Sequence, residues 1–277
     1  MQTGPDWACG VVRQAKKVSP LVDQAGADIK MNALDRSGNR NTRDSFYLGM
    51  SIFSLVIALV GFSRSFYLQD YFSLPELPVR LIVHGTVLTA WFFLACLQPA
   101  LVWNRKTPLH RQTGIAALFI AVAVIVAGVW TVVMRDAPNI DEYPTRAAGN
   151  LASLFMFLFC VALGVYFRRQ SGHHKRLMMM ASIPVLAPAL DRFARIPPLN
   201  DLFGKLLYWF PTPAEIAFAT IAFLALLVLV VIHDLVHEKR VHPGTVWGLV
   251  AIFIFSPAAT AMIVATGGWL AFVKWVA

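Results

Sequence analysis

Residues 113–134 read TGIAALFIAVAVIVAGVWTVVM, a run of 22 residues without a charged side chain. A helix needs about 20 consecutive apolar residues to cross the hydrocarbon core of a bilayer. The run lacks the strand-like alternation of apolar and polar residues, and an α-helix satisfies all of its backbone hydrogen bonds inside a bilayer. The stretch therefore predicts a transmembrane helix, and the rest of the chain follows the same pattern.

The composition of the whole chain is that of a membrane protein. Of its 277 residues, 57% are hydrophobic and 14% are charged, whereas soluble domains are roughly 45–50% apolar and about 25% charged. This excludes a disordered chain and a disulfide scaffold, and it argues against a water-soluble enzyme. The net charge of +9 fits Lys and Arg in cytoplasmic loops, so we expect no nucleic-acid partner.

Seven apolar runs predict an all-α polytopic transmembrane bundle. Residues 1–44 are polar and predict a cytoplasmic tail, and residues 45–277 predict the transmembrane helical domain. Within the tail, residues 11–33 predict either a short surface helix or a mobile segment. The predicted spans are 46–62, 81–103, 113–134, 150–167, 176–190, 216–233 and 245–273. The fifth is short and contains Pro184 and Pro188, so a re-entrant segment is the alternative there.

The distribution of cations predicts the orientation of the bundle. The tail and the turns after the second, fourth and sixth spans carry 16 Lys and Arg residues, and the other side carries 8. Because cytoplasmic loops are enriched in Lys and Arg, this bias places the N-terminus in the cytoplasm and the C-terminus outside.

Histidines next to cations gather on the predicted cytoplasmic side. Such a set of side chains could bind an anionic lipid head group, a small ligand or a partner protein; the alternative is positive-inside anchoring without a bound ligand. The candidate residues are His110, Arg111, His174, Lys175, Arg176, Arg240 and His242.

Two further patterns offer weaker sites. His233 and His237 lie four residues apart, which puts both imidazoles on one helix face, as a metal site would need. The Glu of the zinc-protease motif is absent, and interfacial histidines are the alternative. Asp191 and Arg195 flank Arg192 at the end of the fifth span; they indicate an ion pair that closes the helix, or a substrate contact.

A polar stripe runs along the second span. His84, Trp91 and Gln98 repeat every seven residues and therefore share one helix face. The stripe either lines a pocket or holds neighbouring helices together by hydrogen bonds.

Several motifs together resemble a group of bacterial inner-membrane proteins whose family carries no established activity. They are HG at 84–85, HRQTG at 110–114, HKRLM at 174–178, PALDR at 188–192, and Asp234 followed by Arg240 and His242-Pro243. The resemblance covers roughly residues 45–250 and implies a multi-pass protein of the bacterial inner membrane.

A fainter resemblance is to cytochrome b561-type proteins, which bind haem b through paired histidines. It implies His110 and His174 as the pair near the cytoplasmic surface, because His84, which lies deeper, has no partner at its depth.

Three functions remain open at this point. The first is a non-enzymatic membrane protein whose basic, histidine-bearing face binds an anionic lipid, a small ligand or a partner protein. The second is a b-type haem or quinone redox protein, with His84 as a quinone contact. The third is a transporter or sensor that uses the His84 stripe. The sequence contains neither a phosphate-binding loop nor a nucleophile elbow that would predict an enzyme class.

Overall fold

The computed structural model describes residues 45–136, 144–209, 212–267, 271 and 275. The chain divides into two units, Met1–Ser45 and Phe46–Ala277. The predicted tail, with the surface helix at 11–33, lies outside the described residues. The second unit contains all of the described residues except Ser45.

The part of the chain that the structure describes is helical and contains no strand, which confirms the all-α prediction. A short apolar helix, Ser45–Gly61, comes first. The elements after it are η1 (Ser63–Tyr67), α2 (Val79–Trp103), α3 (Thr107–Asp136), α4 (Pro144–Tyr166), α5 (Ser171–Ala194), α6 (Pro197–Leu206), α7 (Ala214–Glu238), α8 (Pro243–Val250), η3 (Ala251–Phe255) and α9 (Ser256–Thr266).

Six segments are long and apolar enough to cross a membrane. Five of them are α2, α3, α4, α5 and α7, and the sixth is the continuous stretch Pro243–Thr266 formed by α8, η3 and α9. The chain is therefore a multi-pass membrane protein. The helix Ser45–Gly61, which corresponds to the predicted first span at 46–62, is apolar but shorter than these six segments and is not among them.

The fifth span is longer than the sequence indicated, and the structure does not support a re-entrant segment. α5 has 24 residues and a length of about 36 Å at 1.5 Å per residue, which exceeds a hydrocarbon core of about 30 Å. Polar residues extend the helix beyond the apolar run at both ends, and Pro184 and Pro188 lie inside it.

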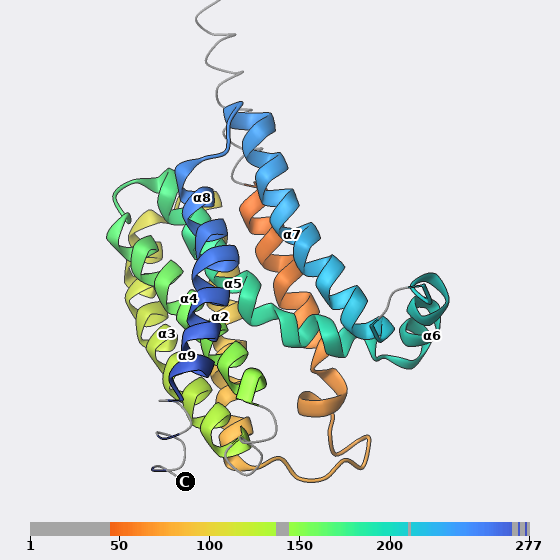
Figure 1. Cartoon of the computed structure of the whole chain (residues 1–277). Coiled ribbons are helices and arrows are strands. Elements are labelled where there is room, and N and C mark those ends of the chain that lie inside the picture. Colours follow the sequence, from red (N-terminus) through yellow and green to blue (C-terminus); the bar gives the residue numbers. More distant parts are fainter. Residues whose placement is uncertain (1–44, 137–143, 210–211, 268–270, 272–274, 276–277) are drawn as a thin grey trace, which may run out of the picture. The chain divides into compact units, whose positions relative to one another are not determined.

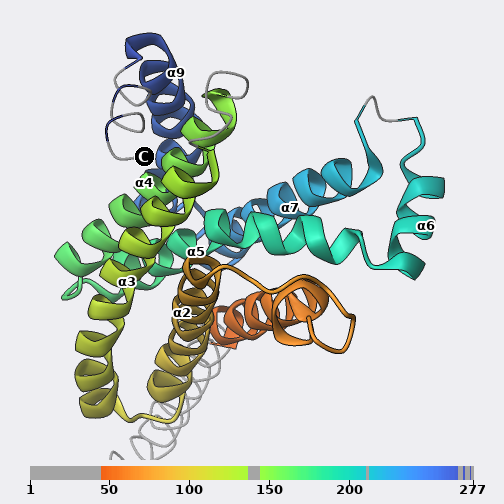
Figure 2. The same cartoon turned by 90° about the horizontal axis from the view of Figure 1, so that it is seen from below.

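α5 is the central helix of the described bundle. It packs against α4, α7 and α8. Of its most apolar stretch of 18 residues, 56% is buried inside the protein, compared with 39% or less of the corresponding stretch in each of the other five spans. α2 and α3 form an antiparallel pair, and α4 joins them to α5 (Figure 1). Figure 2 shows α5 and α7 side by side, with α6 where they end.

The last span contains an irregular turn in its middle. The π-helical turn η3 ends at Phe255, two residues before Pro257, which lies in the first turn of α9. Proline has no N–H to donate to the preceding turn, which accounts for a local change of helix geometry there. Gly267, with φ of 59°, ends α9 in the left-handed conformation.

Candidate functional site

Three interhelical turns meet at one end of the bundle. They are residues 104–106 between α2 and α3, 167–170 between α4 and α5, and 239–242 between α7 and α8. The rings of His110 and His174 lie 6.2 Å apart between centroids, and those of His173 and His242 lie 4.6 Å apart. The predicted gathering of the histidine-bearing turns at one end is confirmed. We call it the basic end.

His110 and His174 face each other across two of these turns. His110 lies in the first turn of α3 and His174 in the first turn of α5, and their ring planes are nearly perpendicular, at 88°. The Nδ1 atom of His174 lies 2.8 Å from the carbonyl oxygen of Gly164. A carbonyl oxygen only accepts hydrogen bonds, so Nδ1 of His174 carries a proton and Nε2 is left as the second, free nitrogen.

Gln98 fixes the other imidazole. Its side-chain amide satisfies its neighbours when the nitrogen donates to Nδ1 of His110 at 2.6 Å and the oxygen accepts from Thr113 Oγ1 at 2.8 Å. An Nδ1 that accepts leaves the proton of a neutral imidazole on Nε2. The free nitrogen of His110 is therefore a hydrogen-bond donor.

The surroundings of the pair are positively charged. Between Glu76 and Asp136, and again between Glu142 and Asp191, the sequence contains no Asp or Glu. Residues 104–111 and 167–175 of the basic end therefore combine three imidazoles, those of His110, His173 and His174, with several cations and no acidic residue. These cations are Arg105, Lys106, Arg111, Arg168, Arg169 and Lys175, all of them exposed except Lys175, which is half-buried.

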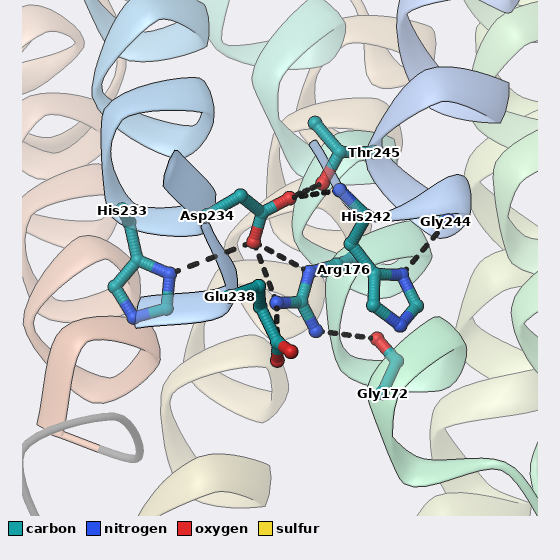
Figure 3. Close-up of polar contacts among 8 residues, drawn as sticks. All are labelled: Gly172, Arg176, His233, Asp234, Glu238, His242, Gly244 and Thr245. Atoms are coloured by element: carbon teal, nitrogen blue, oxygen red, sulfur yellow. Dashed lines mark hydrogen bonds and ion pairs between the residues drawn. The ribbon is translucent and has the colours of Figure 1, made fainter. Parts of the chain in front are cut away.

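A buried ionic network is centred on Asp234 of α7 (Figure 3). Asp234 Oδ1 of α7 accepts from Arg176 Nε of α5 at 2.8 Å and from Nη2 at 2.5 Å. Asp234 Oδ2 accepts from Thr245 Oγ1 at 2.6 Å and from the backbone N–H of His242 at 3.0 Å. The network therefore joins α5, α7 and α8.

The Arg176 guanidinium has little capacity left for a ligand. Its side chain is 1% exposed, Nη1 donates to the Gly172 carbonyl at 3.0 Å, and Nη2 also reaches Glu238 Oε1 at 3.4 Å. Arg176, a candidate ligand residue in the sequence, is therefore committed to the packing of the bundle.

His242 caps α8 with its side chain. Its Nδ1 accepts from the N–H of Gly244 at 3.0 Å, and Figure 3 shows the ring turned toward that residue. Burial, the positive charge of Arg176 and the neighbouring His173 lower the pKa of His242 to about 4. His242 is therefore neutral at physiological pH, whereas Arg240 lies exposed in the same turn.

His233 and His237 lie on α7 away from the other imidazoles. The His233 ring stacks on Phe46 at 4.0 Å, and the His237 ring is 4.6 Å away. Neither ring nitrogen of buried His233 has a hydrogen-bond partner among the described residues, and Nδ1 lies 3.7 Å from Asp234 Oδ1, beyond hydrogen-bond distance. No group of three or more metal-ligating side chains occurs among the described residues, so metal binding here stays a prediction.

The three residues of the polar stripe on α2 contact different parts of the protein. Trp91 is buried, donates from Nε1 to Ser182 Oγ on α5 at 3.2 Å, and packs edge-on against Phe157 at 4.7 Å. Gln98 belongs to the basic end, whereas His84 lies near the other end of α2, with Nδ1 lacking a hydrogen bond. Interhelical bonding therefore accounts for Trp91 and Gln98, and the transporter or sensor hypothesis stays a prediction.

The end of α5 carries the expected ion pair. Arg195 donates to both carboxylate oxygens of Asp191 at 3.1 Å. Arg192 lies over the ring of Phe62, 4.6 Å from its centroid. This pair lies at the opposite end of α5 from His174, so these residues do not join the basic end.

Two contacts were missed by sequence reasoning. The sequence places Arg176 and Asp234 at the ends of apolar runs on the same predicted side, which is a signal for pairing, but nothing in it shows that α5 and α7 are neighbours. The Gln98–His110 contact follows from the α2–α3 hairpin.

Comparisons with protein-family models, curated proteins and solved structures found no match for this chain.

Proposed function

We propose that this multi-pass membrane protein binds a phosphate-bearing anion at its basic end, between His110 and His174. The observation that carries the proposal is the Gln98 contact, which makes Nε2 of His110 a donor. A donor at that position suits an anion, because phosphate oxygens are strong acceptors of N–H hydrogen bonds.

The flanking charge supports the same ligand class. Arg111 and Lys175 each follow one histidine of the pair in sequence, and the two turns carry no carboxylate that would repel an anion. Positive turns at the end of a membrane bundle attract anionic lipid head groups. The phosphate therefore belongs either to a lipid in the same leaflet or to a small solute from the cytoplasm.

The test uses the full chain in lipid nanodiscs. Native mass spectrometry measures phosphatidylglycerol retained by the protein, and calorimetry with inorganic phosphate in phosphatidylcholine nanodiscs measures binding of a free anion. The double variant Arg111→Gln/Lys175→Gln removes two positive charges. Whichever ligand binds the wild type, its affinity for this variant should be about tenfold weaker or more, since hydrogen bonds to charged groups contribute about 1.5–3 kcal/mol.

The control is Lys205→Gln, which removes an exposed cation from α6, away from the basic end. It should leave binding unchanged. Retention of phosphatidylglycerol identifies a lipid, and a calorimetric signal identifies a soluble phosphate. Equal binding by the wild type and the double variant in both measurements would overturn the proposal.

A second candidate function is haem binding by the same pair. Two imidazoles that hold one metal ion from opposite sides, each at about 2.0–2.1 Å, have ring centroids roughly 6 Å apart, and the observed separation is 6.2 Å. His174 fits, because its Nδ1 is tied to a carbonyl and Nε2 is free to ligate. A ligating Nε2 carries no proton, so the proton of His110 would lie on Nδ1. His110 therefore fits only if the oxygen of the Gln98 amide, rather than its nitrogen, faces Nδ1.

A bound haem would supply one-electron transfer at the basic end. Its test is the absorption spectrum of protein purified from haem-supplemented cells. A Soret band that His110→Ala and His174→Ala each abolish, while helix content by circular dichroism is retained, would support this candidate. Absence of the band would leave the anion as the ligand class of the pair.

A further inference from the structure

α6 is an amphipathic helix in a stretch where the sequence predicted only a loop. Ile196 is extended, and Pro197 and Pro198 occupy the first helical positions, where proline is favoured. At 3.6 residues per turn, four apolar side chains share one face and three polar ones lie opposite. The apolar residues are Leu199, Leu202, Phe203 and Leu206, and the polar residues are Asn200, Asp201 and Lys205.

Aromatic contacts fix the level of α6 along the bundle. The Phe203 ring stacks on Phe218 of α7 at 4.1 Å and 25°, and Phe218 also stacks on Phe193 of α5 at 6.0 Å. Phe218 lies about one turn inside α7, which starts at Ala214. The apolar face of α6 is therefore held just inside the end of a membrane span.

Two of the four side chains of that apolar face are largely uncovered by the protein. Leu202 is 47% exposed and Leu206 is 58% exposed. Tyr208 and Trp209 follow directly and are still more exposed. Tyr and Trp are the side chains that gather where hydrocarbon meets water in membranes. Exposed Ile216 and Ile221 continue the apolar surface along α7.

We propose that α6 is an interfacial helix that binds the surface of the lipid leaflet opposite the basic end. Its apolar face points toward the acyl chains, Tyr208 and Trp209 lie among the head groups, and Asp201 and Lys205 face water. Figures 1 and 2 both show α6 beside the adjoining ends of α5 and α7. The two charges of α6 cancel, so apolar burial rather than lipid charge holds it.

The test measures which solvent surrounds each face of α6. A nitroxide label is placed at Leu206→Cys or, as the matched control on the opposite face, at Asp201→Cys. The background carries Cys9→Ser and Cys96→Ala and keeps Cys160, which is fully buried. Power-saturation electron paramagnetic resonance in nanodiscs then compares collisions with oxygen, which enters lipid, and with a water-soluble nickel complex.

We expect the label at Leu206 to collide mainly with oxygen and the label at Asp201 mainly with nickel. The pattern should be the same in phosphatidylcholine alone and with phosphatidylglycerol added. Equal nickel accessibility at both positions would overturn the proposal by placing the helix in water. Shielding of Leu206 from both reagents would also overturn it, because a protein surface would then cover the face. A requirement for phosphatidylglycerol would contradict the apolar basis of binding.

Discussion

At the scale of single residues, the Arg176–Asp234 pair depends on complete hydrogen bonding. Both side chains are removed from solvent, at 1% and 0% exposure, and the desolvation of two charges costs several kcal/mol for each ion. The carboxylate offsets this cost with four donors, two from Arg176, one from Thr245 and one from the backbone of His242. Removing one partner is therefore far more damaging than replacing both.

Asp234→Asn should lower the free energy of unfolding by about 3–5 kcal/mol, because it leaves the buried Arg176 guanidinium with only the more distant carboxylate of Glu238, at 3.4 Å, as a counter-charge. The double variant Arg176→Met/Asp234→Leu should recover most of that loss. Denaturant titration of the detergent-solubilised protein measures both. Asp191→Asn, in the exposed pair with Arg195, is the control and should cost within about 1 kcal/mol. Equal effects of the two single variants would contradict the prediction.

Two glycines of the helix Ser45–Gly61 should respond to alanine in opposite ways. A Cβ on Gly61 would overlap the carbonyl oxygen of Ala189 on α5, whereas a Cβ on Gly49 would meet nothing within 4 Å. We expect Gly61→Ala to lower the thermal unfolding midpoint, because a backbone atom cannot move aside as a side chain can. Gly49→Ala should raise it slightly, since alanine is favoured over glycine in helices by about 1 kcal/mol. A rise in both variants would show that the two helices are not in close contact.

At the scale of elements, three consecutive residues determine where α8 begins. His242 is extended and accepts a hydrogen bond from Gly244, and Pro243 takes the first helical position. The cap works only while Nδ1 carries no proton. The start of α8 is therefore coupled to the charge of one imidazole, and burial and Arg176 keep that imidazole neutral.

This coupling predicts a pH dependence of stability. The folded protein holds the pKa of His242 at about 4, whereas an unfolded histidine titrates near about 6.5. The unfolded state thus binds the proton first as the pH falls. The contribution of His242 is complete above about pH 6.5 and is lost between that pH and about 4. His242→Asn keeps a capping oxygen without the titration.

Unfolding midpoints of the wild type and His242→Asn, measured between pH 7.5 and pH 4.5 in the same detergent, check this prediction. The wild type should lose more stability than the variant over that range. Parallel curves would mean that protonation of His242 is not linked to folding.

At the scale of the whole molecule, hydropathy predicted the spans well because length and apolar composition are properties of each segment alone. All seven apolar runs contain helix, and the long spans were located to within a few residues or one or two turns at the described ends. The predicted run of α5, at 15 residues, is the shortest of the seven, because protein rather than lipid surrounds most of that helix. A helix in the centre of a bundle tolerates polar ends that a lipid-facing helix does not.

The site was predictable only in part. The gathering of His110, His174 and His242 at one end followed from alternating topology and cation counts. The Arg176–Asp234 bond did not follow, because it needs α5 beside α7, and helix adjacency is not encoded in hydropathy. α6 was missed because its ten residues begin with two prolines and form too short an apolar run to be read as a span.

The topology predicts which side of the membrane each turn faces. Lys106→Cys, Arg169→Cys and Arg240→Cys should be shielded from a membrane-impermeant maleimide in intact bacterial cells and become reactive in inverted vesicles. Lys205→Cys should show the opposite pattern, because α6 lies at the other end of α5. Labelling of Arg169→Cys and Lys205→Cys from the same side would contradict the alternating arrangement, and exchange of the two patterns would reverse the assigned orientation.

The buried ionic network has a consequence for how the chain is made. Asp234 is synthesised 58 residues after Arg176, which at 5–20 residues per second is a delay of roughly 3 to 12 s. During that interval the growing polypeptide carries a guanidinium in a central helix before its counter-charge has left the ribosome. We therefore expect that helix to reach its final packing only after α7 and the start of α8 have emerged, because they supply Asp234 and Thr245.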